Sequence, residues 1–166
     1  SYAKEFGTSI DEAARRSRIL AARGNLAIDL RNEFESRFAG SYLEHVPDLR
    51  IVVRLTGNSP VSSRLAVNDE GSIPIAFLTD ARATLEELEA ALDAHQKALY
   101  SKIPALQGLY ADERTGDIVL VVHAPEVESK AYEAEAPVLS KMLGHPVRFV
   151  FEPSPSQETA SARGGA

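Results

Sequence analysis

The chain has 166 residues, of which 44% are hydrophobic and 25% are charged, a composition typical of about one globular domain. These values exclude a wholly disordered chain, a collagen and a coiled-coil rod. The formal net charge of −6 argues against non-specific nucleic-acid binding, which needs positive charge to neutralise phosphates. The absence of cysteine excludes disulfides, thiolate nucleophiles and zinc–thiolate sites.

Targeting and membrane signals are also missing from the sequence. The longest dense apolar run, residues 118–122, has the length of a strand and falls far short of the ~18 residues of a membrane span. The first residues lack the charged-then-apolar layout of a signal peptide, and they lack an initiator methionine. We therefore expect a piece of a longer precursor, with any secretion signal lying upstream.

Two helices are predicted in the first 38 residues. Ser9 and Glu12 form a capping box that starts a helix over residues 10–23. Basic residues gather toward its C-terminal half, where the helix dipole favours cations: Arg15, Arg16, Arg18 and Arg23. After Gly24 and Asn25, apolar residues spaced four apart predict a second helix with one buried face: Leu26, Leu30, Phe34 and Phe38.

The pattern then changes to strands. Residues 40–46 and 49–56 are predicted as two strands joined by a short turn at Pro47. Residues 57–72 are rich in Gly, Asn, Ser and Pro, which indicates a loop with room for a short strand near residues 65–67. Another strand is expected over residues 73–78.

The second half begins with another capping box at residues 84–87, which opens a helix that reaches Leu99. Two strands, residues 106–111 and 117–123, surround a hairpin loop at residues 112–116.

A last helix and strand follow Pro125. Pro137 is expected to kink or break this helix, and Gly144 to end it in the left-handed conformation. Residues 146–151 form the final predicted strand, and the Pro-, Ser- and Gly-rich residues after Glu152 are predicted to be a tail.

An internal similarity links the two halves. Residues 40–44, Gly-Ser-Tyr-Leu-Glu, match residues 108–112, Gly-Leu-Tyr-Ala-Asp, and the same offset places residues 49–54 against 117–122. We therefore predict an α+β fold of two helix-plus-antiparallel-hairpin subdomains in a duplicated arrangement. The predicted boundaries are an N-terminal helix at 1–24, subdomains at 25–80 and 81–152, and a flexible tail at 153–166.

Candidate catalytic groups are sparse. His45 stands beside Glu44 and Asp48, as a general base would, but an exposed hairpin residue is the more economical interpretation. Of the remaining histidines, His95 and His123 are expected to be structural, and His145 is expected in a turn. No G-x-S-x-G elbow occurs, and the acidic groups fall on helix starts or outer faces, so we predict no catalytic, cofactor or metal site.

Three motifs resemble a known family. Residues 108–122, Gly-Leu-Tyr-Ala-Asp-Glu-Arg-Thr-Gly-Asp-Ile-Val-Leu-Val-Val, resemble the hairpin in pro-regions of alpha-lytic-protease-like and streptogrisin-like bacterial serine proteases. Residues 38–45 with 50–54 look like a segment of secreted-protease precursors. Residues 162–166, Ala-Arg-Gly-Gly-Ala, are similar to the junction with the mature protease. The long helix at 11–23 and the loop at 57–72 do not obviously belong to the family pattern.

The resemblance implies a non-catalytic pro-region that assists the folding of its protease and inhibits it, outside the cytoplasm. The partner would be a protease domain in cis or another protein. The docking strands would present Leu109, Tyr110, Asp112, Ile118, Leu120 and Val122. The inhibitory tail and cleavage junction would comprise Glu158, Thr159, Ala160, Ser161, Ala162 and Arg163.

Two other functions stay open at this point. The chain is also compatible with a sensory or peptide-binding module of an exported protein, in which an open sheet edge binds the ligand. An enzyme that uses His45 with Glu44 ranks last.

Overall fold

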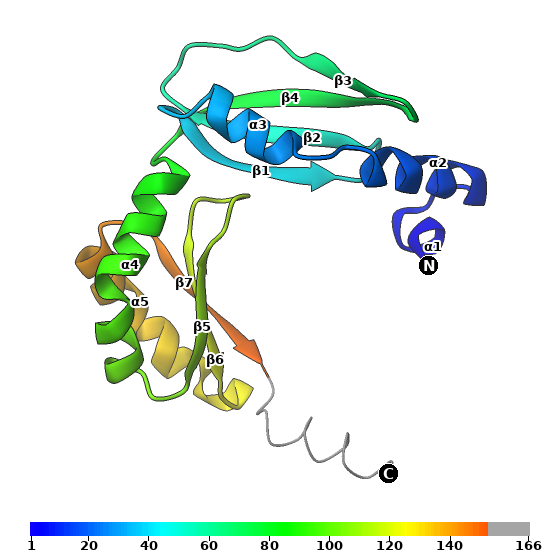
Figure 1. Ribbon diagram of the computed structural model, residues 1–166. Helices are drawn as coiled ribbons and strands as arrows, with labels where there is room; N and C mark the ends of the chain where they lie inside the picture. Colours follow the sequence, from blue (N-terminus) through cyan, green and yellow to red (C-terminus); the bar gives the residue numbers. More distant parts are fainter. Residues whose placement is uncertain (153–166) are drawn as a thin grey trace. The chain divides into compact units, whose positions relative to one another are not determined.

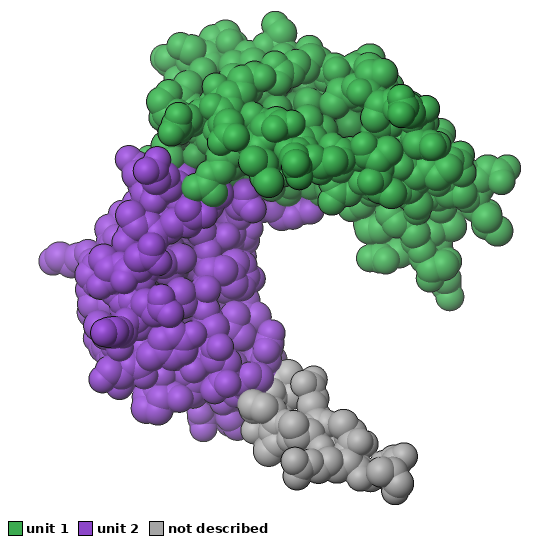
Figure 2. Space-filling view, in the orientation of Figure 1, with its two compact units in different colours: residues 1–84 green, residues 85–166 purple. Residues whose placement is uncertain are grey.

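The computed structural model describes residues 1–152, so the predicted tail at 153–166 lies outside the described residues. The chain divides into two compact units, one formed by residues 1–84 and one that begins at Leu85 (Figure 2). The first unit includes the helical segment predicted as a separate N-terminal part. The boundary lies four residues beyond the predicted end of the first subdomain.

The first unit combines three helices with a four-stranded sheet (Figure 1). Its elements are α1 (Tyr2–Phe6), α2 (Ile10–Ala21), α3 (Leu26–Glu33), β1 (Phe38–Glu44), β2 (Arg50–Thr56), β3 (Arg64–Asn68) and β4 (Gly71–Ala81). The strand order is β1-β2-β4-β3, with β2 and β4 parallel and the other pairs antiparallel. The predicted α+β class and the predicted antiparallel hairpin, β1 with β2, are confirmed. The parallel strand β4 makes the sheet mixed, which was not predicted from the sequence. Parallel strands need a crossover, and residues 57–70 provide one that contains β3.

The helices of the first unit form where their caps and apolar faces predict them. The Ser9 hydroxyl accepts the N–H of Glu12 at 3.0 Å, which confirms the capping box. Leu30 of α3 is buried, and the Phe34 ring packs on Phe77 of β4 with 5.2 Å between ring centroids. The predicted helical stripe is shortened, because α3 ends at Glu33 and Phe38 already begins β1.

The second unit is an open-faced sandwich of three strands and two long helices. Its elements are α4 (Leu85–Lys102), β5 (Leu106–Ala111), β6 (Ile118–His123), the 3₁₀ helix η1 (Glu126–Glu128), α5 (Ser129–Leu143) and β7 (Val147–Glu152). The strand order is β5-β6-β7, antiparallel between β5 and β6 and parallel between β6 and β7. Both α4 and α5 lie on the same face of this sheet (Figure 1).

The predicted break at Pro137 does not occur, because α5 continues through it to Leu143. Proline removes the N–H that would bond to Glu133, but both residues are exposed, so water can satisfy that carbonyl. The predicted helix end is confirmed, since Gly144 adopts φ 76° and its N–H donates to the carbonyl of Ser140 at 2.8 Å.

The two units repeat one strand pattern. Gly40 pairs with Arg54 in the first unit, and Gly108 pairs with Val121 in the second. In each case the register shifts just before the glycine, which places a β-bulge at the same point of both hairpins. With this pairing, the first strands of the two hairpins are 68 residues apart in the sequence, as predicted. The second strands are 67 residues apart, one fewer than predicted. Each hairpin is then extended by a parallel third strand, β4 or β7.

Candidate functional site

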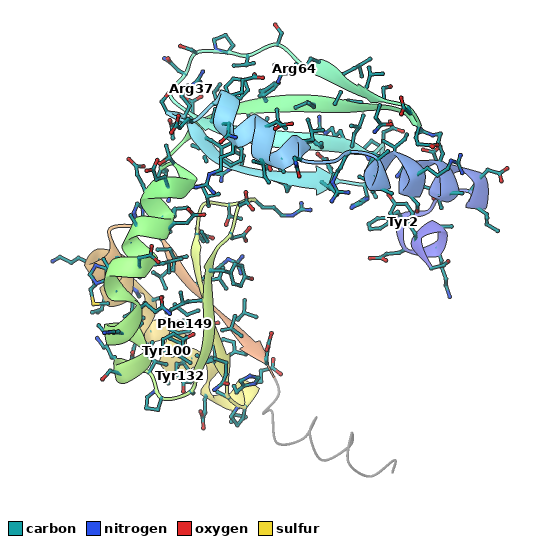
Figure 3. The ribbon with its side chains drawn as sticks, viewed as in Figure 1. Tyr2, Arg37, Arg64, Tyr100, Tyr132 and Phe149 are labelled. Atoms are coloured by element: carbon teal, nitrogen blue, oxygen red, sulfur yellow. The ribbon has the colours of Figure 1, made fainter. Side chains whose placement is uncertain are left out.

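The sheet of the second unit has a closed face, which α4 and α5 cover, and an open face, which no described helix covers, although Val119 on the open face is also 0% exposed. The closed face carries Ile118, Leu120 and Val122 of β6, all with 0% exposure. Tyr132 of α5 packs against Phe149 and Phe151 of β7 on this side, with ring centroids 5.6 and 5.9 Å apart (Figure 3 labels the first two). Three of the residues predicted to dock on a partner therefore form the core beneath the helices. Their side chains are not available to a partner in the folded protein.

β5 is one of the two edge strands of this sheet, and β7 is the other. Because β6 lies between β5 and β7, only the two outer strands have an unpaired side among the described residues. The N–H of Asp112 donates to the carbonyl of Asp117 at 2.8 Å, so Asp112 faces the neighbouring strand. Backbone groups alternate along an antiparallel strand, so those of Leu109 and Ala111 point away from β6. Two peptide groups are thus exposed for pairing with an added strand.

Tyr110 and Asp112 occupy different positions around this edge. The Tyr110 side chain is 47% exposed and lies on the open face, since its neighbours Leu109 and Ala111 point to the helical side. Asp112 accepts the backbone N–H of Arg114 at 2.9 Å and a hydrogen bond from Arg148 of β7.

Asp112 fixes the turn that follows β5. Burial acts to raise its pKa, but the hydrogen bonds from Arg114 and Arg148 outweigh this, and the pKa lies below its usual value. Arg148 also lies 3.3 Å from the carboxylate of Asp117 at the other end of the turn. The carboxylate predicted to contact a partner therefore ties the β5–β6 turn to β7, and so holds the end of the β5 edge in place.

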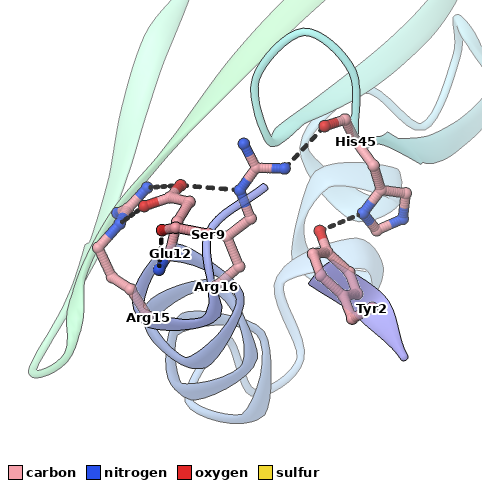
Figure 4. A network of polar contacts seen from close by, with 6 residues as sticks. All are labelled: Tyr2, Ser9, Glu12, Arg15, Arg16 and His45. Atoms are coloured by element: carbon pink, nitrogen blue, oxygen red, sulfur yellow. Dashed lines mark hydrogen bonds and ion pairs between the residues drawn. The ribbon is translucent and has the colours of Figure 1, made fainter. Parts of the chain in front are cut away.

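His45 belongs to a packed cluster at the end of β1 (Figure 4). Its Nδ1 and the Tyr2 hydroxyl share a hydrogen bond of 2.7 Å, and the Phe6 ring stacks on the imidazole at 4.3 Å. The half-buried imidazole is thus covered by α1, so the expectation of an exposed hairpin residue was wrong. The Glu44 carboxylate bonds to Arg50 at 2.7 Å. This pairing gives no support to a catalytic pair of His45 with Glu44.

Arg16 is the polar centre of that cluster and was not recognised from the sequence. It is 2% exposed, and its guanidinium donates to the His45 carbonyl at 2.7 Å and to the Glu12 carboxylate at 2.8 Å (Figure 4). Arg15 bonds to the same carboxylate from the solvent side. The sequence does not show which of the four arginines of this segment is buried. The spacing of four between Glu12 and Arg16 indicates only that their side chains can pair on a helix.

The Glu12 carboxylate makes this cluster sensitive to acid. Hydrogen bonds from Arg15 and Arg16 lower its pKa from 4.5 to about 2. A carboxyl with a depressed folded-state pKa stabilises the fold above its unfolded pKa, and that contribution is lost as the pH falls from about 4.5 toward about 2. We expect Glu12→Gln to have a lower thermal midpoint than wild type at neutral pH. The difference in thermal midpoint between the two proteins, the gap, should narrow as the pH falls from about 4.5 toward about 2. Melting curves at several pH values measure the gap, and a constant gap would contradict the assignment.

The other histidines lie on different parts of the second unit. His123 Nε2 lies 3.9 Å from the Glu152 carboxylate where β6 and β7 end, and His95 lies on α4. Among residues 1–152 no group of histidine and acidic side chains has the arrangement of a metal site. In the same part of the chain no helix has the length and apolarity needed to cross a membrane. The predicted inhibitory residues, 158–163, lie outside the described residues.

Comparison with known proteins adds no family to this description. Neither a protein family nor a curated protein matches the chain. The open β5 edge is therefore the candidate site that rests on structure alone.

Proposed function

We propose that this chain is a non-catalytic, pro-region-like domain of a secreted bacterial serine-protease precursor, and that it binds its protease by adding a strand to β5. The observation that carries the proposal is the outward-facing backbone of Leu109 and Ala111 on an edge strand. Both residues lie within residues 108–122, which carry the resemblance to alpha-lytic-protease-like pro-regions.

Strand addition suits a folding assistant. Backbone hydrogen bonds supply affinity without requiring a particular sequence in the partner. The β5 edge is backed by the buried strand β6 and by two helices, so it is ordered before a partner arrives. A partner that binds the folded protease and its folding transition state, but not the unfolded chain, favours folding.

The tail and the cellular location complete the proposal. Residues 158–163 would lie in the protease cleft after cleavage, and the chain would act outside the cytoplasm, in cis or on another protein. A peptide-binding module of an exported protein would use the same edge. It would bind extended peptides without changing the folding of a protease, which separates the two functions.

The Ala111→Pro variant tests the β5 edge. Proline removes the outward N–H of residue 111 while leaving the bonds to β6 that Tyr110 and Asp112 make. We expect at least about tenfold weaker binding to a catalytic domain of the alpha-lytic-protease-like or streptogrisin-like class, which corresponds to the loss of about 1.4 kcal/mol. Calorimetry on the native protease measures binding, and activity recovered after dilution from denaturant measures assistance.

Ala111→Ser is the matched control, because it changes the side chain and keeps the N–H. Wild type and this control should raise the recovered activity and inhibit the native protease, whereas Ala111→Pro should do neither at equal concentration. Circular dichroism establishes that all three chains are folded. If wild type changes neither the folding nor the activity of a protease from either class, the proposed function is wrong. If Ala111→Pro matches wild type, the role of β5 is wrong.

A further inference from the structure

The sheet of the first unit ends in the edge strand β3, whose outer side pairs with no other strand among residues 1–152. β3 and β4 form a hairpin with a two-residue turn, Asp69 and Glu70, between the paired residues Asn68 and Gly71. In such a hairpin the terminal pair is hydrogen-bonded, so the backbones of Asn68, Ala66 and Arg64 face β4. The peptide groups of Leu65 and Val67 consequently point outward, away from the sheet.

The same two residues also present apolar side chains to solvent. Leu65 is 60% exposed and Val67 is 77% exposed. Both lie on the face opposite Arg64, whose guanidinium sits over the Phe34 and Phe77 rings at 5.9 and 5.5 Å. Apolar side chains beside outward peptide groups are the combination that soluble proteins usually avoid at an edge.

Within the described residues, β3 lacks three of the usual protective devices, which are a bulge, a proline and a lysine. Its pairing with β4 has no register shift, and its five residues, Arg-Leu-Ala-Val-Asn, contain no proline or lysine. The one charged side chain, Arg64, bonds to Glu33 at 2.6 Å and lies on the face opposite Leu65 and Val67. An edge of this kind is expected to be covered by another strand.

We infer that the occupant is a second copy of the chain, with two β3 strands paired antiparallel about a two-fold axis at Ala66. In this register Leu65 of each copy faces Val67 of the other, so all the outward peptide groups of these residues bond across the axis. The exposed Leu65 side chain then packs beside the exposed Val67 side chain of the second copy. Ala66, the smallest of the three, meets its own counterpart.

The charges of the hairpin favour the same partner. Arg64 stands at the start of β3, and Asp69 follows its end in the turn. Antiparallel self-pairing brings the basic end of each strand beside the acidic end of the other, whereas a parallel arrangement would bring like charges together. An unrelated strand would need apolar residues at the same spacing, a small residue between them and charges in the opposite order. A second copy of β3 in the antiparallel direction meets all three conditions. The inference uses the sheet of the first unit and is independent of the proposed function of β5.

Sedimentation of the intact chain over a dilution series tests this pairing. We expect wild type to pass from the monomer mass of 18.0 kDa to twice that mass as concentration rises. Val67→Lys places a charge between the two paired β3 strands and should raise the dimer dissociation constant at least about tenfold. Val138→Lys is the matched control, because it makes the same change at a valine of α5 that is 61% exposed.

A cysteine at the axis tests the register. Facing residues of a non-hydrogen-bonded antiparallel pair have Cα atoms about 4.5 Å apart, within the range of a disulfide. The natural chain has no cysteine, so Ala66→Cys introduces a single thiol. We expect this variant to form a covalent dimer on mild oxidation much faster than the exposed control Val138→Cys. A monomer at every concentration overturns the inference. So does a dimer that tolerates Val67→Lys and links no faster through residue 66 than through 138.

Discussion

Replacing Leu120 by alanine is expected to lower the free energy of unfolding of the second unit by about 2–5 kcal/mol. Leu120 is fully buried at the centre of the sheet, with Leu109 beside it on β5 and Phe149 on β7. The truncation removes apolar contacts and leaves a cavity that strands held on both sides cannot close. Denaturant titration followed by circular dichroism measures the loss.

Tyr110→Ala is the companion variant on the open side of β5. Because the tyrosine side chain is 47% exposed, we expect it to change stability by about 1 kcal/mol or less. Under the proposed function its effect should fall on protease binding. The pair therefore separates residues that build the sheet from residues that a partner can contact. If both variants lost the same stability, the assignment of Leu120 to the core and of Tyr110 to the accessible surface would be wrong.

Arg16→Ala is expected to lower the free energy of unfolding of the first unit by about 2–4 kcal/mol. The change leaves the His45 carbonyl without its donor and removes one of the two arginines that hold Glu12. It also removes the arginine contact with Tyr2, which is the largest cause of the raised pKa of Arg16. Chemical denaturation at neutral pH measures the effect.

Arg15→Ala is the matched control, because Arg15 bonds to the same carboxylate with 48% of its side chain exposed. Exposed ion pairs contribute little, so we expect a loss below about 1 kcal/mol. Arg16→Lys should recover only part of the stability, since an ammonium cannot reproduce the planar fork that serves two acceptors. If Arg15→Ala and Arg16→Ala lose the same stability, the buried position of Arg16 has no special weight.

Local patterns predicted the elements of this chain well. The Ser9 capping box, the left-handed Gly144 and the repeated Gly-x-Tyr-x-acid strands all appear where the sequence predicts them. Each of these features depends on residues only a few positions apart, so the local sequence is enough to predict it. The pairing of β2 with β4 was missed, because residues far apart in the sequence decide it.

One signal for the missed pairing of the third strand in the second unit was nevertheless present. Residues 118–122 are apolar at every position, whereas a strand with one exposed face alternates. An unbroken apolar run is typical of a strand flanked on both sides and buried on both faces. Read in that way, it would have assigned Ile118, Leu120 and Val122 to the core. With this strand in the centre, the strands predicted over residues 106–111 and 146–151 would have been the two edges of the sheet.

The parallel third strand in each unit has a consequence for synthesis. A hairpin forms as soon as its two strands leave the ribosome, but β2 and β6 must wait for β4 and β7 before their second edge is paired. For β6 the wait includes the whole of α5, and its partner β7 ends only at Glu152. The most apolar strand of the chain is thus the one whose protection arrives last. The nascent second unit is consequently the stage at which aggregation or chaperone capture has the greatest opportunity.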